Sequence, residues 1–203
     1  MGGDTVGAPP RRRRIAKALA AAVVIAVAAT ACLHFAWPEA GTADIGGSFR
    51  LQSQDGGMVD SKDLLGRPYG VFFGFTHCPE VCPTTLSDLA QAFAAISDLP
   101  PDFRVYFISV DPERDTPPVL KEYTANFDPR IVGLWASPEE LAKVAKEFKV
   151  YYEKVPTSDG GYTMNHTAVV FLMDRRGRFR GAIEYDDPVE VYVRKLQALI
   201  AGD

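Results

Sequence analysis

Two apolar runs in the middle of the chain lack the alternation of apolar and polar residues that a half-buried strand shows. They are Tyr69 to Phe75 (YGVFFGF) and Arg104 to Val110 (RVYFISV), and this pattern is typical of strands that are buried on both faces. Between them, Thr84 to Ile96 places apolar side chains at a helical period. A buried strand, a helix and a second buried strand in this order predict an α/β domain.

The pattern on either side extends this α/β order. Toward the N-terminus, a Gly-rich turn at Gln54 to Gly57 joins two short strands. Toward the C-terminus, helices and strands alternate until a strand hairpin and a last amphipathic helix close the chain. We expect one domain with mixed sheet pairing, whose spacing matches a thioredoxin-like fold with an extra N-terminal β-hairpin and a helical insertion around Val119 to Phe148. The remaining expected elements are Phe49 to Ser53, Met58 to Asp60, Val119 to Phe127, Ile131 to Ala136, Glu139 to Phe148, Thr167 to Met173, Phe179 to Glu184 and Pro188 to Ile200.

The N-terminal part of the chain has a different pattern. Lys17 is the only charged residue between Ile15 and Trp37, and the uncharged stretch after it is long enough to cross a hydrocarbon core of roughly 30 Å. Arg11 to Arg14 precede this stretch, and such positive charge stays in the cytoplasm. We therefore expect a cytoplasmic basic N-terminus (1–14), one transmembrane helix (15–37), a tether (38–47) and an exported domain (48–203).

Two other interpretations of the apolar stretch stay open. It is rich in alanine and only moderately hydrophobic, so a cleaved secretory signal would also explain it. Lipid attachment at Cys32 after cleavage is the other interpretation, although Ala29 to Ala31 lack the bulky aliphatic residue that is usual three positions before such a cysteine. All of these interpretations place the folded domain outside the cytoplasm.

The charge of the expected exported domain limits its partners. Five of the 22 basic residues precede Pro38, which leaves 17 basic and 25 acidic residues from there onward and a net charge of −8. A nucleic-acid partner would require a basic face that neutralises phosphates, so we expect none. The chain has only three cysteines, which are too few for a disulfide scaffold.

Two of the cysteines form a motif, Cys78 to Pro83 (CPEVCP), where the first buried strand gives way to a helix. Unpaired amides and the dipole at a helix N-terminus stabilise a thiolate and lower its pKa. If the segment is helical, the thiols of Cys78 and Cys82 lie about one turn apart on the same face. They could form an inert disulfide, exchange disulfides as a redox-active pair, or hold one soft metal ion. The spacing alone does not decide among these.

A third ligand would distinguish a metal site from a bare dithiol, and His166 is the best candidate. It directly precedes the strand that begins at Thr167, so we expect it on a loop at a sheet edge. A single histidine beside a strand is more often a hydrogen-bonded structural residue, but the alternatives are few. His34 lies in the apolar stretch, and His77 adjoins Cys78, where we expect it to face solvent.

Asp111 follows the second buried strand at its C-terminal end, where open α/β sheets place functional loops. Two interpretations are equally good. The residue could cap the entry to the next helix, or it could orient a ligand from outside the first coordination shell.

Three ordered motifs resemble the Sco (SenC) proteins: Phe73 to Leu86 (FGFTHCPEVCPTTL), Val110 to Pro117 (VDPERDTP) and Asn165 to Thr167 (NHT). The resemblance runs from about Ile45 to the C-terminus. It implies a thioredoxin-like fold tethered to a membrane and one copper ion, as Cu(I), Cu(II) or both. The implied ligands are Cys78, Cys82 and His166, with Asp111 as a neighbour of the site.

The resemblance also implies a role in assembly. Such proteins help to load the binuclear copper A centre of cytochrome c oxidase subunit II, and other copper chaperones or thioredoxin-like reductants are further expected partners. The arginine cluster and the short length favour a bacterial protein, held as a single-pass protein in the cytoplasmic membrane with its C-terminal domain in the periplasm. The sequence departs from the commonest family pattern at Asn165, where an aspartate is usual, and at Phe75, where a tyrosine is frequent.

Two other activities compete with copper delivery. A thiol-disulfide reductase would keep the cysteines of the copper-receiving subunit reduced through Cys78 and Cys82. A peroxidase would use Cys78 as its peroxide-reactive thiol and needs an arginine nearby, for which Arg114 is the only candidate. We therefore expect primarily a metal-binding assembly factor, with thiol-disulfide oxidoreductase activity as the main alternative.

Overall fold

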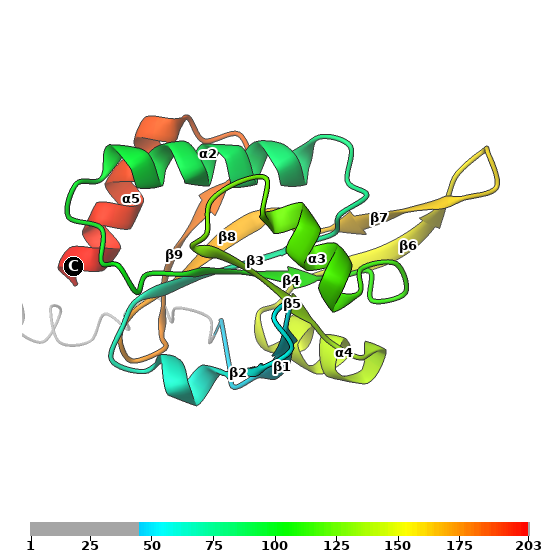
Figure 1. The fold of residues 1–203 in the computed structure, drawn as a ribbon, viewed down its shortest axis with the longest axis horizontal. Helices are drawn as coiled ribbons and strands as arrows, with labels where there is room; N and C mark the ends of the chain where they lie inside the picture. Colours follow the sequence, from blue (N-terminus) through cyan, green and yellow to red (C-terminus); the bar gives the residue numbers. More distant parts are fainter. Residues whose placement is uncertain (1–44, 203) are drawn as a thin grey trace, which may run out of the picture. The chain divides into compact units, whose positions relative to one another are not determined.

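The computed structural model of the protein describes residues 45–202. Within that range it contains nine strands, one 3-10 helix and four α-helices (Figure 1). In chain order they are β1 (Arg50–Ser53), β2 (Met58–Asp60), η1 (Ser61–Leu64), β3 (Tyr69–Gly74), α2 (Val81–Ala95), β4 (Val105–Ser109), α3 (Pro117–Thr124), β5 (Ile131–Trp135), α4 (Pro138–Glu147), β6 (Tyr152–Pro156), β7 (Tyr162–His166), β8 (Val169–Met173), β9 (Phe179–Glu184) and α5 (Val189–Ala201).

Seven strands form one mixed sheet in the order β2-β1-β5-β4-β3-β8-β9. Strands β3, β4 and β5 run parallel, and the flanking strands pair antiparallel. The register places Gly74, at the end of β3, opposite Ser109, at the end of β4. The loops that follow these two strands therefore begin side by side. One contains the cysteine motif and the other contains Asp111.

Helices cover both faces of the sheet, with α2, α3 and α5 on one face and α4 on the other (Figure 1). The central strand β3 is buried along its whole length, as its uninterrupted apolar run predicts. Consecutive side chains of a strand point to opposite faces. Phe72 accordingly packs against Phe107, with ring centroids 5.8 Å apart, whereas Phe73 packs against Phe148, just beyond α4, at 5.5 Å.

The sequence placed the start of the first long helix too late. It begins at Val81 rather than Thr84, because a proline is tolerated in the first turn of a helix and Pro83 therefore does not delay it. Cys82 lies inside that first turn, and Cys78 lies in the loop before it. The other predicted elements are present, and their ends differ from the prediction by at most three residues.

The sequence pattern missed the hairpin of β6 and β7. The two strands form a separate antiparallel sheet that extends away from one end of the main sheet (Figure 1). His166 is the last residue of β7, so the expectation of a loop position was wrong. Side chains of β6 are mostly exposed, and a strand without a buried face gives no apolar alternation to detect.

The expected N-terminus, transmembrane helix and nearly all of the tether (1–44), including Cys32 and His34, lie outside the described residues. Among residues 45–202, no helix is long and apolar enough to cross a membrane.

Candidate metal centre

Cys78, Cys82 and His166 meet at one point of the fold. Their ligand atoms all lie within 4.8 Å of one another, although the histidine is 84 positions from the nearer cysteine in the sequence. Cys82 Sγ is 3.7 Å from His166 Nε2, and the Cys82 amide donates to Cys78 Sγ over 3.3 Å. The predicted cluster of two thiols and one imidazole is therefore present in the structure.

The end of β3 shapes the cysteine half of this cluster. The Cys78 amide donates to the Phe75 carbonyl over 3.3 Å, which turns the chain sharply after the strand. Cys82 is fully buried and lies against Gly74. A Cβ at position 74 would be 2.8 Å from Cys82 Sγ and 2.5 Å from Phe107 Cε2, distances that real Cβ contacts do not reach. The sulfur therefore occupies space that only a glycine leaves open.

The imidazole of His166 has a defined tautomer. Its Nδ1 lies 3.0 Å from the Thr167 carbonyl oxygen, and a carbonyl can only accept a hydrogen bond, so Nδ1 carries the proton. This leaves the lone pair of Nε2 directed toward Cys82 and available to a metal ion. The ring also forms a T-shaped pair with Phe75, with centroids 5.7 Å apart and planes at 88°.

The two thiols have opposite electrostatic environments. A hydrogen bond from the Cys82 thiol, together with weaker bonds from the backbone, outweighs burial and lowers the pKa of Cys78 to about 4. The pKa of Cys82 is raised, because its proton is shared with Cys78, its sulfur is buried and the Cys78 thiolate is close. At neutral pH, Cys78 is therefore the partly exposed thiolate and Cys82 the buried thiol.

Asp115 supports the cysteine loop, and sequence reasoning did not single it out. Its carboxylate is fully buried and accepts from the Thr76 amide at 3.0 Å, the Thr76 hydroxyl at 2.6 Å and the Ser109 hydroxyl at 2.7 Å. His77 is half exposed, and its Nδ1 lies 3.9 Å from the same carboxylate. The only sequence signal was that Asp115 shares the VDPERDTP motif with Asp111.

Asp111 is buried, and its contacts are with the hairpin that carries His166. It accepts from the Tyr162 hydroxyl at 2.9 Å, and it forms an ion pair with Arg114. Arg114 in turn donates to the Tyr162 carbonyl at 3.0 Å. Among the hydrogen bonds and ion pairs of the described residues, none joins Arg114 to Cys78, so the arginine that a peroxidase would need is engaged elsewhere.

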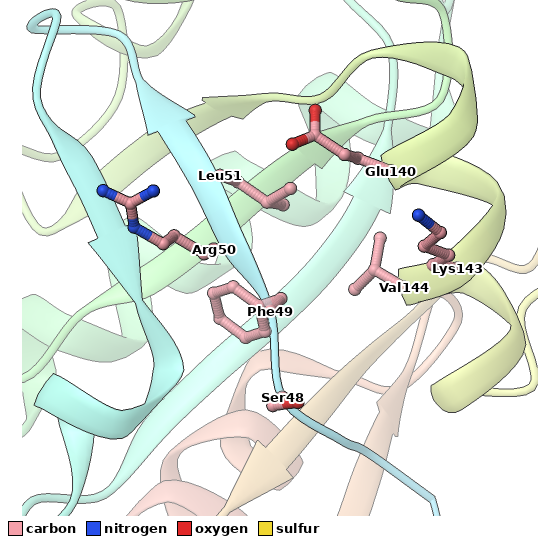
Figure 2. A pocket seen from close by; sticks show the side chains of 7 residues that line it. All are labelled: Ser48, Phe49, Arg50, Leu51, Glu140, Lys143 and Val144. Carbon is pink, nitrogen blue, oxygen red and sulfur yellow. The ribbon is translucent and has the colours of Figure 1, made fainter.

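A hollow of about 210 Å³ lies between β1 and α4, away from the thiols (Figure 2). Phe49, Leu51 and Val144 form its apolar part, and Arg50, Glu140 and Lys143 are the charged residues around it. None of its lining residues is a cysteine or a histidine. The cluster of Cys78, Cys82 and His166, rather than this hollow, has the chemistry of a metal site.

Comparison with known proteins agrees with this geometry. The family model described as SCO1/SenC matches residues 38–201. The chain belongs to the SCO1/SenC family. The protein named "SCO1 homolog 1, mitochondrial" from Arabidopsis thaliana is 44% identical over 143 residues, which are 70% of this chain and 43% of that protein.

Solved structures extend the likeness to three dimensions. Bradyrhizobium japonicum ScoI with copper bound is 46% identical with a TM-score of 0.70, covering 76% of this chain and 99% of that one. BsSco, a member of the Sco family of cytochrome c oxidase assembly proteins that has a disulfide switch, is 26% identical with a TM-score of 0.62, covering 79% and 96%. The predicted thioredoxin-like α/β fold is thereby confirmed.

The donor set of this SCO1/SenC protein also fits copper. Two sulfurs favour Cu(I), and an added imidazole nitrogen admits Cu(II) as well. Cys78, Cys82 and His166 offer this set with the imidazole tautomer already fixed. They form a candidate copper site, as the sequence predicted.

Proposed function

We propose that this protein is a copper metallochaperone that delivers copper to the copper A site of cytochrome c oxidase subunit II during assembly. The observation that carries the proposal is the convergence of two thiols and the free Nε2 of an imidazole within 4.8 Å. Cys78 and Cys82 would supply two thiolates and His166 its Nε2. Copper is the cargo of this activity, and the site would have to release it as well as bind it.

The residues around the site suit the binding step. Cys78 is already a thiolate near neutral pH, so it can take copper without first losing a proton. Cys82 must lose its proton when the metal binds, which makes affinity depend on pH. The hydrogen bond from His166 Nδ1 to the Thr167 carbonyl holds the imidazole plane while Nε2 receives the metal.

We further propose that the protein is a single-pass protein of a bacterial cytoplasmic membrane with its copper-binding domain in the periplasm. The support is sequence alone: residues 15–37 are apolar, and Arg11 to Arg14 precede them. Copper chaperones or thioredoxin-like reductants in the same compartment would load copper onto the protein or restore its thiols.

A thiol-disulfide reductase is the second candidate, and the unequal thiols favour it. The partly exposed Cys78 thiolate would attack a disulfide of the copper-receiving subunit and release one thiolate of that subunit. Cys82 would then attack the mixed disulfide, which frees the second thiolate and leaves a Cys78–Cys82 disulfide. A dithiol reductant must reduce that disulfide before another cycle.

Copper titration of the full-length protein in detergent tests the first proposal. We expect one copper ion per chain, and we expect His166→Ala to weaken affinity and to change the sulfur-to-Cu(II) charge-transfer bands. His77→Ala is the matched control, because His77 is a half-exposed neighbour of Cys78. Unchanged affinity and spectrum in His166→Ala would rule out the three-ligand site.

The reductase is tested with the copper-free protein and an oxidised peptide that contains the copper A cysteines. Reduction that requires both Cys78 and Cys82 but proceeds normally in His166→Ala would favour this activity over metal transfer. Full activity in Cys78→Ser would exclude it.

A further inference from the structure

The strand that carries His166 is weakly attached to the rest of the protein. It belongs to the two-stranded sheet of β6 and β7, which is separate from the seven-stranded sheet and extends beyond it (Figure 1). Tyr152 and Met164 are the members of the two strands that pack against the hydrophobic core. A two-stranded hairpin by itself is marginally stable in water, so other contacts must hold His166 toward the thiols.

One face of β7 contacts the loop between β4 and α3. Side chains two residues apart share a face of a strand, so Tyr162, Met164 and His166 point the same way. At one end of this face, the Tyr162 hydroxyl donates to Asp111 at 2.9 Å. In the middle, Met164 lines a hollow together with Asp111. At the other end, His166 Nε2 approaches Cys82 Sγ.

The ring of Tyr162 lies against two cations. The guanidinium carbon of Arg114 is 3.7 Å from the ring centroid, and Lys154 Nζ is 3.9 Å from it. Each cation is also paired with a carboxylate of the loop, Arg114 with Asp111 and Lys154 with Glu113 at 2.7 Å. Arg114 also donates to the Tyr162 carbonyl over 3.0 Å. Both the side chain and the backbone of Tyr162 are thus held by the loop.

The same loop holds the cysteine half of the site. Asp115, four residues beyond Asp111, accepts from the amide and the hydroxyl of Thr76, two residues before Cys78. A single short loop therefore contacts the segments that present both the thiols and the imidazole, although these segments are far apart in the sequence.

We propose that Tyr162 and Arg114 are positioning residues of the copper site: they clamp β7 to the loop after β4 so that His166 Nε2 faces Cys78 and Cys82. The proposal deepens the copper function proposed above and rests on it for its biological meaning. The clamp itself is a property of the copper-free protein. It can therefore be tested without copper.

The first experiment uses the reduced, copper-free, full-length protein in detergent with isotope-labelled histidine. Because the chain has three histidines, the ring signals of His166 can be assigned by substitution. In Tyr162→Leu we expect loss of the contact between the rings of His166 and Phe75. We also expect amide exchange in β6 and β7 to become at least about tenfold faster while β3 and β4 keep their protection.

Two further variants sharpen this result. Tyr162→Phe keeps the ring between the cations but removes the bond to Asp111, so its effect should be intermediate. Tyr151→Leu is the matched control, since Tyr151 is exposed next to β6, and among residues 45–202 its hydroxyl bonds only to Glu153. An unchanged ring contact and unchanged exchange in Tyr162→Leu would overturn the proposal, and so would an equal effect in Tyr151→Leu.

The second experiment measures copper affinity in a double-mutant cycle. Loss of a residue that orients a ligand typically costs about tenfold to hundredfold in affinity, and we expect this for Tyr162→Leu. In the His166→Ala background the same substitution should cost nothing more, because the ligand that it positions is gone. An equal loss in both backgrounds would overturn the clamp as the cause. If the wild-type protein binds no copper, the proposed function fails, and the copper-free experiment still decides the clamp.

Discussion

Gly74 offers a direct test of how the sheet positions the buried sulfur. In Gly74→Ala the new methyl group would lie 2.8 Å from Cys82 Sγ and 2.5 Å from Phe107 Cε2. Forcing an extra carbon into a packed core costs about 1–3 kcal/mol. Replacing glycine by alanine recovers only ~0.4–1 kcal/mol through the unfolded state. We therefore expect a net loss of about 1–2 kcal/mol in the free energy of unfolding, together with weaker copper binding as Cys82 shifts.

Gly70→Ala is the matched control for this prediction. Gly70 lies on the same strand and the same face, and a Cβ there would be 2.9 Å from Val105 Cγ2, far from the thiols. Urea unfolding should show that both variants lose stability, whereas copper titration should show weaker binding only in Gly74→Ala. Removing the sulfur with Cys82→Ala should reduce the cost of Gly74→Ala. Equal copper affinity in the two glycine variants, or no coupling to Cys82, would refute the reasoning.

Two further predictions concern the cysteine loop. Asp115→Asn turns one of the carboxylate's accepting oxygens into a donor and leaves a buried donor unpaired. The free energy of unfolding, measured by urea denaturation, should therefore fall by ~2–3 kcal/mol. A loss below ~0.5 kcal/mol would contradict the assigned hydrogen bonds. Because the pKa of Cys78 is lowered to about 4, the copper-free protein should react with iodoacetamide at a nearly constant rate from about pH 6 to 8. An ordinary thiol would instead react about tenfold faster for each pH unit in this range. Cys82→Ala is the control, because it removes the thiol that donates to Cys78, and its rate should rise with pH in this way.

The half of the site that the sequence predicted well is the half built from regular, buried elements. The apolar run of β3 identifies a strand buried on both faces, and the cysteine motif begins where that run ends. The sequence position of the two cysteines then nearly fixes where they lie in the fold, because the short connection between the end of a strand and the start of a helix has little conformational freedom. The proximity of Cys78 and Cys82 could therefore be predicted from neighbouring residues alone.

The different roles of Asp111 and Asp115 could not be predicted from the local sequence. Asp111 and Asp115 follow the same strand in the same motif, and sequence patterns give no means of assigning them different tasks. The turn between them is closed by the Asp115 amide, which donates to the Asp111 carbonyl at 3.0 Å. After this turn, one carboxylate meets Thr76 and the other meets Tyr162. Only the fold separates the two roles.

The histidine half was harder to predict for a related physical reason. Strands β6 and β7 bury little apolar surface, so no hydrophobic pattern marks them, and polar contacts with a loop about 50 positions earlier hold them in place. The fully buried Cys82 and Asp115 belong to the core, whereas His166 depends on the side chains of Tyr162 and Arg114. Substitutions in the core should therefore affect stability and copper affinity together. Substitutions in the clamp should reduce copper affinity while leaving the unfolding of the main sheet nearly unchanged, and this contrast is what separates the two halves of the site.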